Sequence, residues 1–114
     1  MNLRDQGKEG EEIAKQHYLN QGYTLLEQNY TIRWGEIDLL MKKEKTLIAI
    51  EVKIVNHIDE IDQCISAKKI WFLHKTLQYY LQNTKESTFE EIRMDAVFIK
   101  NNKIVEIYED ITNT

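Results

Sequence analysis

Charged residues are set among apolar ones in the segment GEIDLLMKKEKTLIAIEVK, residues 35–53. Glu36 and Asp38 are separated by one residue, and so are Glu51 and Lys53. Burying carboxylates close together costs free energy unless they are paired, protonated or bound to a cation. Carboxylates are the ligands that the hard cations Mg²⁺ and Mn²⁺ prefer. With an ammonium group nearby, such a site suits the hydrolysis of a phosphodiester.

Two strands joined by the turn KKEK must position these side chains. Because side chains alternate between the two faces of a strand, Glu36 and Asp38 share one face of the first strand. Glu51 and Lys53 likewise share one face of the second. The face opposite Asp38 carries the apolar residues Ile37, Leu39 and Met41. If the register follows the short turn, the polar pairs meet, whereas a shift of one residue would turn one pair away.

A simpler alternative exists for the second pair. Glu51 and Lys53 can form a solvated strand face, with an ion pair across to Asp38, since acid-x-lysine is a common tripeptide. The residues from Ile48 to Ile54 are too apolar for an exposed ribbon, which favours the buried arrangement.

The stretch from Asp5 to Gly22 predicts a helix, with Asp5 as its N-cap and Gly22 as its stop. Glu11 falls on the flank of the apolar stripe of this helix, where it can lean over the sheet as a third carboxylate. The neighbouring Glu9 and Glu12 point away. The alternative is that all three glutamates compensate the helix dipole.

The remaining elements follow from periodicity and turn residues. Residues 23–32 predict a strand before the hairpin, and residues 61–81 predict a long helix because apolar residues recur three and four apart. Residues 92–99 and 103–110 flank an asparagine-containing turn and predict a terminal hairpin. The fold class is therefore α/β, in one domain spanning residues 1–114.

The second helix has a basic and aromatic face opposite its apolar stripe. This face carries Lys68, Phe72, Lys75 and Tyr79, with Trp71 at its edge. Such a face can bind phosphates and stack bases. It is also typical of a homodimer interface or of a second buried face, and the pattern favours these over nucleic acid.

Composition limits the class of protein. The net charge of −4 argues against a general nucleic-acid coat protein, although residues 63–82 contain three lysines and no acid. The single cysteine, Cys64, cannot form an internal disulfide, and the first residues lack an apolar signal core, so we expect a cytoplasmic protein. No apolar run is long enough to span a membrane.

Several segments carry a resemblance to a known family: GKEGEEIA, GY, NYTIRWGEIDLL, TLIAIEVK, SAKKI and IRMDAVFI. Over nearly the whole chain they resemble the YraN-type family of uncharacterised bacterial proteins. That family is placed in the restriction-endonuclease-like superfamily, whose signature is PD-(D/E)XK, and it is similar to archaeal Holliday-junction resolvases. The resemblance implies a mixed sheet flanked by helices, a bound Mg²⁺ or Mn²⁺, and DNA as the substrate, including branched or processed DNA.

The resemblance also implies roles for single residues. Glu11, Asp38 and Glu51 would bind the metal, and Lys53 would act with Asp38 and Glu51 in catalysis. Glu36 would support these acids without being a metal ligand.

On the second helix, the resemblance implies that Lys69 projects toward the sheet or a phosphate. Lys68 and Lys75, from the basic face of the same helix, are further candidates for binding nucleic acid. Many relatives have an arginine two residues after the motif lysine, where this chain has Val55.

Three functions remain open from the sequence. The first is a metal-dependent DNA endonuclease. The second is a catalytically silent module of the same fold that binds nucleic acid or assembles with protein. The third is a protein-interaction module built around the basic aromatic helix, as a homodimer or with another partner.

Overall fold

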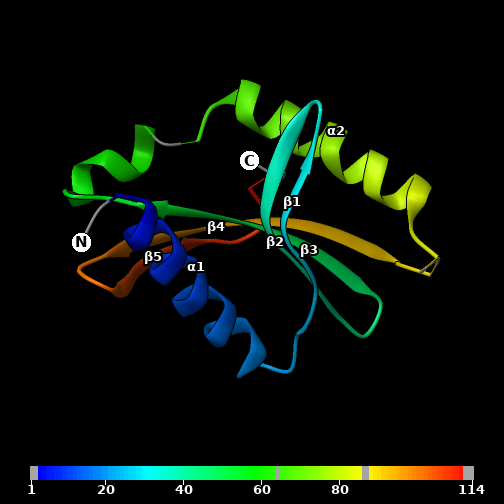
Figure 1. The fold of residues 1–114 in the computed structure, drawn as a ribbon, viewed down its shortest axis with the longest axis horizontal. Helices are drawn as coiled ribbons and strands as arrows, with labels where there is room; N and C mark the ends of the chain where they lie inside the picture. Colours follow the sequence, from blue (N-terminus) through cyan, green and yellow to red (C-terminus); the bar gives the residue numbers. More distant parts are fainter. Residues whose placement is uncertain (1–2, 64, 86–87, 112–114) are drawn as a thin grey trace.

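The computed structural model describes residues 3–63, 65–85 and 88–111, so Cys64 lies outside the described residues. The chain folds in the predicted order of helix, three strands, helix and two strands (Figure 1). The elements are α1 (Leu3–Leu19), β1 (Thr24–Ile32), β2 (Gly35–Lys43), β3 (Thr46–Ile54), the 3₁₀ helix η1 (Ile58–Gln63), α2 (Ala67–Asn83), β4 (Glu91–Lys100) and β5 (Lys103–Tyr108).

The strands form one mixed sheet in the order β1-β2-β3-β4-β5. The first three strands are antiparallel, β3 and β4 are parallel, and β5 is antiparallel to β4. A parallel neighbour requires a crossover, which the segment containing α2 provides. The turn of the last hairpin is formed by Asn101 and Asn102, whose φ angles of 51° and 59° are those of a two-residue hairpin turn.

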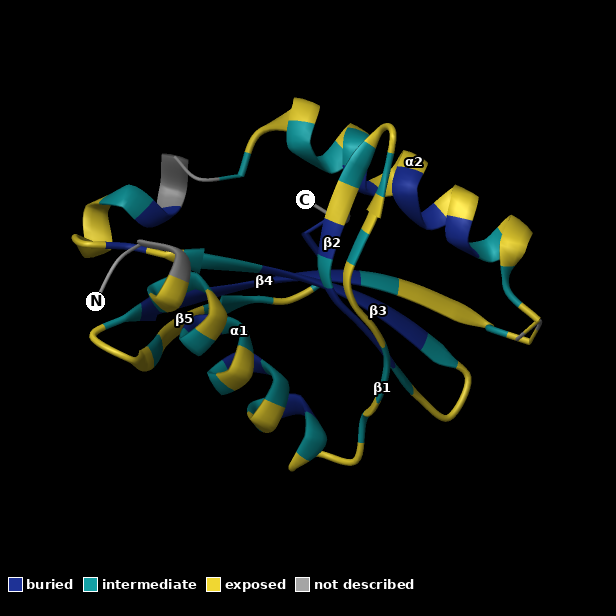
Figure 2. Ribbon diagram, in the orientation of Figure 1, coloured by how far each residue is buried: buried dark blue, intermediate teal, exposed yellow. Residues whose placement is uncertain are grey.

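The helices cover opposite faces of the sheet (Figures 1 and 2). Ala14 and Tyr18 of α1 pack in one core cluster with even-numbered residues of β3. Leu73 and Leu77 of α2 pack in the other cluster with odd-numbered residues of β3. The even set includes Ile48 and Ile50, and the odd set includes Leu47 and Ala49. Glu51 and Lys53 continue the odd series, so they lie on the α2 side of the sheet.

Strand β2 leaves β3 before it leaves β1. The last pair between β2 and β3 is Leu39 with Ile50, whereas β2 stays paired with β1 as far as Gly35. Strand β3 stays paired with β4 along its whole length, to Ile54. The end of the β1–β2 hairpin is therefore separate from the rest of the sheet, and Asp38 is the first residue of β2 beyond the shared pairing.

Contacts with α2 hold this separate end of the hairpin. A Cβ at Gly35 would lie 3.0 Å from the hydroxyl oxygen of Thr76, so glycine allows the backbone to approach the helix closely. Tyr30 and Tyr80 also meet edge to face, with ring centroids 5.4 Å apart. The hairpin end is thus positioned by packing on α2 and not by pairing with β3.

Some local predictions were wrong. Helix α2 begins at Ala67 and not near Ile61, because Ser66 is its N-cap and accepts a hydrogen bond from the Lys69 N–H at 3.1 Å. The residues before it form η1 instead. Asp5 lies inside the first turn of α1 and is not its N-cap.

A prediction about the faces of β2 was also only partly right. Leu39 and Met41 belong to the cluster on the α1 side, as alternation predicts, but Ile37 packs in the cluster on the α2 side. Ile37 lies beyond the last pair with β3, where the separate hairpin end approaches α2.

Candidate metal and phosphate site

Asp38 lies where β2 and β3 part. It is one residue beyond their last pair, Leu39 with Ile50, and its charge interacts with that of Glu51. The Val52 N–H faces β2, because alternate N–H groups of β3 point to opposite neighbours and the Val55 N–H bonds to Ile99 in β4. Asp38 Oδ2 accepts this Val52 N–H at 2.8 Å. The carboxylate therefore satisfies a backbone donor at the point where strand pairing ends.

Glu51 is the buried acid of the site, with 4% of its surface exposed. Its Oε1 atom forms ion pairs with Lys69 Nζ at 3.2 Å and with Lys53 Nζ at 3.6 Å. Its Oε2 atom is buried and has no hydrogen-bond partner among the described residues. A carboxylate oxygen left this way costs free energy unless another group, such as a cation, meets it.

Glu11 brings a third carboxylate to these two from α1. Its Oε1 atom is likewise buried and without a hydrogen-bond partner in the part of the chain that the structure describes. Burial raises the pKa of Glu11, hydrogen bonds from the Gln28 and Asn29 side chains lower it, and repulsion from other acids, including Glu51, raises it further. Glu11 is close enough to Glu51 for their charges to interact although α1 and α2 cover opposite faces.

Asp38 responds most strongly to this crowding of acids. Burial, followed by repulsion from Glu51, raises the pKa of Asp38 to about 7. The hydrogen bond from Val52 lowers that pKa, and the charges of Glu11 and Glu36 raise it again. The site thus holds more negative charge than its protein partners neutralise, which is the condition that favours a bound cation.

The residues fit a hard divalent cation in a particular way. Across residues 3–63, 65–85 and 88–111, no three histidine, cysteine, aspartate or glutamate side chains form a ready cage for a metal ion. Mg²⁺ needs no such cage, because it keeps several waters and commonly takes one or two carboxylates together with phosphate oxygens. Asp38 and the free oxygen of Glu51 are the two carboxylates suited to this, with Glu11 beside them.

The structure gathers some of the predicted lysines and leaves others apart. Lys53 and Lys69 both contact Glu51. Lys68 and Lys75 are exposed on α2 and make no ion pair with the acids in the described residues. Lys75 instead lies over the Trp71 ring, 5.3 Å from its centroid.

The two other positions singled out from the sequence also separate. Glu36 is exposed and lines a hollow beside Lys69, so it lies next to the site but not in its buried part. Val55 is 2% exposed and packs in the core on the α2 side. No cation stands at position 55, and the second ammonium beside Glu51 comes from Lys69.

These positions decide between alternatives left open by the sequence. Glu51 is buried, which rules out a solvated strand face for it. The outer face of α2 is not a second buried face within this chain, because Trp71 and Tyr79 are 52% and 45% exposed (Figure 2).

A buried polar network in β4 was missed by the sequence analysis. Asp95 is 1% exposed and accepts hydrogen bonds from the Tyr18 hydroxyl at 2.7 Å and from the Asp110 N–H at 3.0 Å. It also accepts hydrogen bonds from Nε and Nη2 of Arg93, at 3.0 and 3.1 Å. Arg93 also donates to the Tyr23 hydroxyl at 3.2 Å. In the sequence, the only clue is an arginine and an aspartate on the same face of an apolar strand. Both oxygens of Asp95 accept hydrogen bonds. Because Tyr18 lies in α1 and Asp95 in β4, the network anchors α1 to the sheet.

Comparison with known proteins places the chain in a family. The sequence profile of the uncharacterised protein family UPF0102 matches residues 10–99. The chain belongs to the UPF0102 family. The match confirms the predicted YraN-type resemblance, and the matched part contains all three acids and both lysines of the candidate site.

Individual UPF0102 proteins are similar over most of their length. The chain is 34% identical to a UPF0102 protein of Persephonella marina, with 89% of this chain and 88% of that protein covered. It is 36% identical to one of Flavobacterium johnsoniae, with 84% and 81% covered, and 35% identical to one of Neisseria meningitidis, with 94% of each covered. Among the described residues of this UPF0102 protein, no helix is long and apolar enough to cross a membrane.

Proposed function

We propose that this UPF0102 protein hydrolyses phosphodiester bonds of DNA with a divalent cation, Mg²⁺ or Mn²⁺, at Asp38 and Glu51. The observation that carries the proposal is the buried Oε2 atom of Glu51, which has no hydrogen-bond partner among the described residues although the Asp38 carboxylate is close enough to repel its charge. Acids that only stabilised the fold would be expected to have each oxygen paired, as Asp95 has.

The charge balance of the site supports a phosphate substrate. The ammonium groups of Lys53 and Lys69 share a single oxygen of Glu51, and their side chains are 34% and 36% exposed. Both can therefore reach a phosphate without leaving Glu51. A cation between the acids would polarise the phosphate and lower the pKa of an attacking water.

Hydrolysis needs a few definite tasks from the protein. The oxygen of a water forms a bond to phosphorus as the water loses a proton to the solvent, the bond from phosphorus to the departing nucleoside oxygen breaks, and that oxygen gains a proton from the solvent. Lys53 is placed to donate a hydrogen bond to a non-bridging phosphate oxygen, where negative charge grows. Lys69 can hold the neighbouring phosphate, since it reaches the site from a different element. Asp38 and Glu51 would hold the cation, and Glu11 would add negative charge beside it.

The test is a cleavage assay with labelled DNA. Purified protein is incubated with Mg²⁺ or Mn²⁺ and with single-stranded, duplex, flapped and four-way DNA. We expect cleavage of at least one substrate, which Asp38→Asn and Lys53→Ala abolish. Matched controls are Asp59→Asn and Lys103→Ala, which change exposed residues outside the site and should cleave like the wild type.

A second readout follows metal binding without cleavage. A ligand that binds only the folded state raises the melting temperature as its concentration rises. Mg²⁺ or Mn²⁺ should therefore raise the melting temperature of the wild type and of Asp59→Asn, but not that of Asp38→Asn. Retained DNA binding with no cleavage by any form, and no response of the melt to either ion, would refute the enzyme and leave the catalytically silent module.

A further inference from the structure

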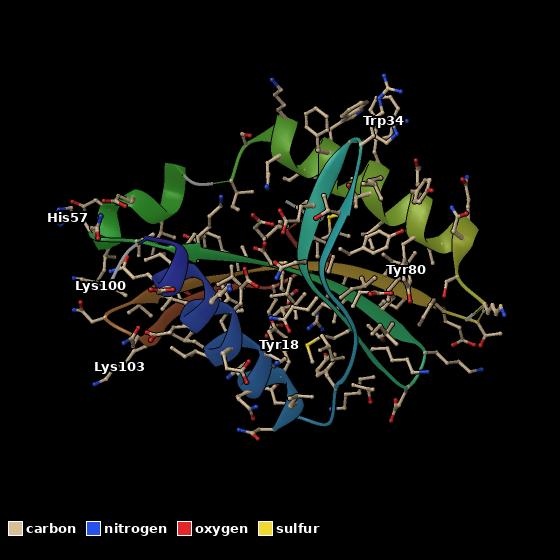
Figure 3. All side chains as sticks on the ribbon, viewed as in Figure 1. Tyr18, Trp34, His57, Tyr80, Lys100 and Lys103 are labelled. Atoms are coloured by element: carbon tan, nitrogen blue, oxygen red, sulfur yellow. The ribbon has the colours of Figure 1, made fainter. Side chains whose placement is uncertain are left out.

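We infer that the end of the β1–β2 hairpin and the outer face of α2 form a binding surface for unpaired nucleotides of DNA, next to the acidic site. We call it the tryptophan surface; it consists of Arg33, Trp34, Lys69, Trp71, Phe72, Lys75 and Tyr79. The inference rests on the proposed function in taking DNA as the substrate, and it adds which form of DNA the site receives. Figure 3 shows Trp34 at the end of the hairpin, beside α2.

Exposed aromatic rings are the first observation. The chain has two tryptophans, Trp34 and Trp71, and each is 52% exposed. Tyr79 is 45% exposed on the same helix as Trp71. Exposed apolar side chains that gather in one patch mark a surface to which a partner binds. Stacking on aromatic rings is how proteins bind unpaired bases without regard to sequence, because every base has a flat face.

Cations accompany each tryptophan. The Arg33 guanidinium lies 5.3 Å from the centroid of the Trp34 ring, and Lys75 Nζ lies 5.3 Å from that of Trp71. Arginine and lysine beside stacking rings are suited to the phosphates between successive bases. A surface that binds only a second copy of this chain would not need these charges, whereas a nucleic-acid strand needs both.

The shape of the surface connects it to the acids. One hollow of about 200 Å³ is lined by Trp34, Phe72 and Lys69, among others, and a wider one of about 550 Å³ is lined by Trp34, Arg33 and Tyr79, among others. Trp34 therefore lies between two neighbouring hollows. Lys69 lines the smaller one while its ammonium contacts Glu51, so this hollow adjoins the acidic site.

The sizes of the hollows favour separate bases over a duplex. The smaller hollow is below the range of pockets that hold drug-sized ligands, and it suits one flat ring. A paired base cannot enter it without leaving its stack, which costs a few kcal/mol for intact duplex and nothing for an unpaired base. A strand that crosses Trp34 and then enters the smaller hollow would deliver its next phosphate to Lys69 and Glu51.

The test measures binding in EDTA, so that no cleavage occurs. The probes are a single strand of about 12 thymidines, within the usual site sizes for stacked strands, and a blunt duplex of equal length. Trp34→Ala should weaken binding of the single strand roughly 5- to 150-fold, the fold-change expected for one lost stacking contact. Binding of the duplex should change less than about twofold on the same grounds.

Two further variants keep the result interpretable. Trp34→Phe retains a stacking ring and should keep most of the affinity. Ile58→Ala removes another exposed apolar side chain, 61% exposed in η1, and should bind like the wild type.

Because both tryptophans lie on this surface, the single strand should also quench the intrinsic fluorescence of the wild type and of Trp71→Phe.

Distinct results overturn the surface and the proposed function. Unchanged single-strand binding by Trp34→Ala, or an equal loss for single strand and duplex, refutes the tryptophan surface. So does a change from dimer to monomer in Trp34→Ala by light scattering, which would identify an interface between two copies. If Trp34→Ala loses affinity as expected but the wild type cleaves no DNA, the nuclease is refuted and the tryptophan surface stands. If the wild type cleaves DNA but Trp34→Ala keeps its affinity, the tryptophan surface is refuted and the nuclease stands.

Discussion

Replacing Asp38 by asparagine should make the protein more stable at alkaline pH. Asparagine keeps an oxygen that can accept the Val52 N–H, which Asp38 accepts at 2.8 Å, but it carries no charge. Burial and the charge of Glu51 raise the pKa of Asp38 to about 7. The folded protein therefore favours the protonated form of this carboxyl group. The unfolded chain has the ordinary pKa of 3.8, so unfolding releases a proton between these two values.

The sign and size follow from proton linkage. Between about pH 4 and pH 7 the folded state binds more protons than the unfolded state, so the free energy of unfolding falls as pH rises. The full difference is about 3 pKa units, or about 4 kcal/mol once both states are ionised. Between about pH 5.5 and pH 8.5, the part lost is about 2 kcal/mol. Asp38→Asn has no carboxyl group at this position, so its free energy of unfolding should not fall by this amount over the same pH interval.

The assay is urea unfolding of the wild type and Asp38→Asn at both pH values, in EDTA. The quantity compared is the change in the free energy of unfolding between the two pH values, which cancels differences common to both. The wild type should lose about 2 kcal/mol more than Asp38→Asn over this interval. Asp59→Asn, which removes an exposed aspartate in η1, should follow the wild type. Parallel curves for Asp38→Asn and the wild type would refute the raised pKa and the crowding of acids that explains it.

Other predictions follow from contacts described above. Tyr18→Phe removes the 2.7 Å donor to Asp95 and should lower the free energy of unfolding, measured in urea, by about 1–2 kcal/mol. The dependence of this free energy on urea concentration should not change. An unchanged midpoint of the urea transition would contradict the network. Gly35→Ala should cost about 1–3 kcal/mol, because its Cβ would press on a buried threonine of α2, and its melting temperature should fall. Lys69→Ala should destabilise the fold by about 1 kcal/mol, because Glu51 loses the closer of its two ammonium partners, and added Mg²⁺ should restore part of the lost melting temperature.

The strands and the pairing of β2 with β3 were predictable because the turn between these two strands is short and apolar residues recur regularly along both. The short turn between β2 and β3 sets which residues face each other, so the polar pair of β2 was expected to meet that of β3. The terminal hairpin was predictable for the same reason, since Asn101 and Asn102 adopt positive φ angles readily. These features depend on residues close together in the sequence.

The start of α2 was misplaced although its signal is local, because the apolar residues of η1 fit the helical spacing and the Ser66 N-cap was overlooked. Features that depend on distant packing were not predictable. The pairing of Lys69 with Glu51 depends on where α2 crosses the sheet. The burial of Asp95 depends on Tyr18, 77 residues away, which no local pattern in β4 reveals.

The early end of pairing between β2 and β3 divides the candidate site between two parts of the backbone. Glu51 belongs to strands that are hydrogen-bonded along their whole length, whereas Asp38 is tied to them by one hydrogen bond from Val52. A cation or phosphate held by both acids would act as a cross-link between these parts. Amide hydrogen exchange at Val52 and at the hairpin residues before Leu39 should therefore slow on binding, while exchange in β4 stays as it was.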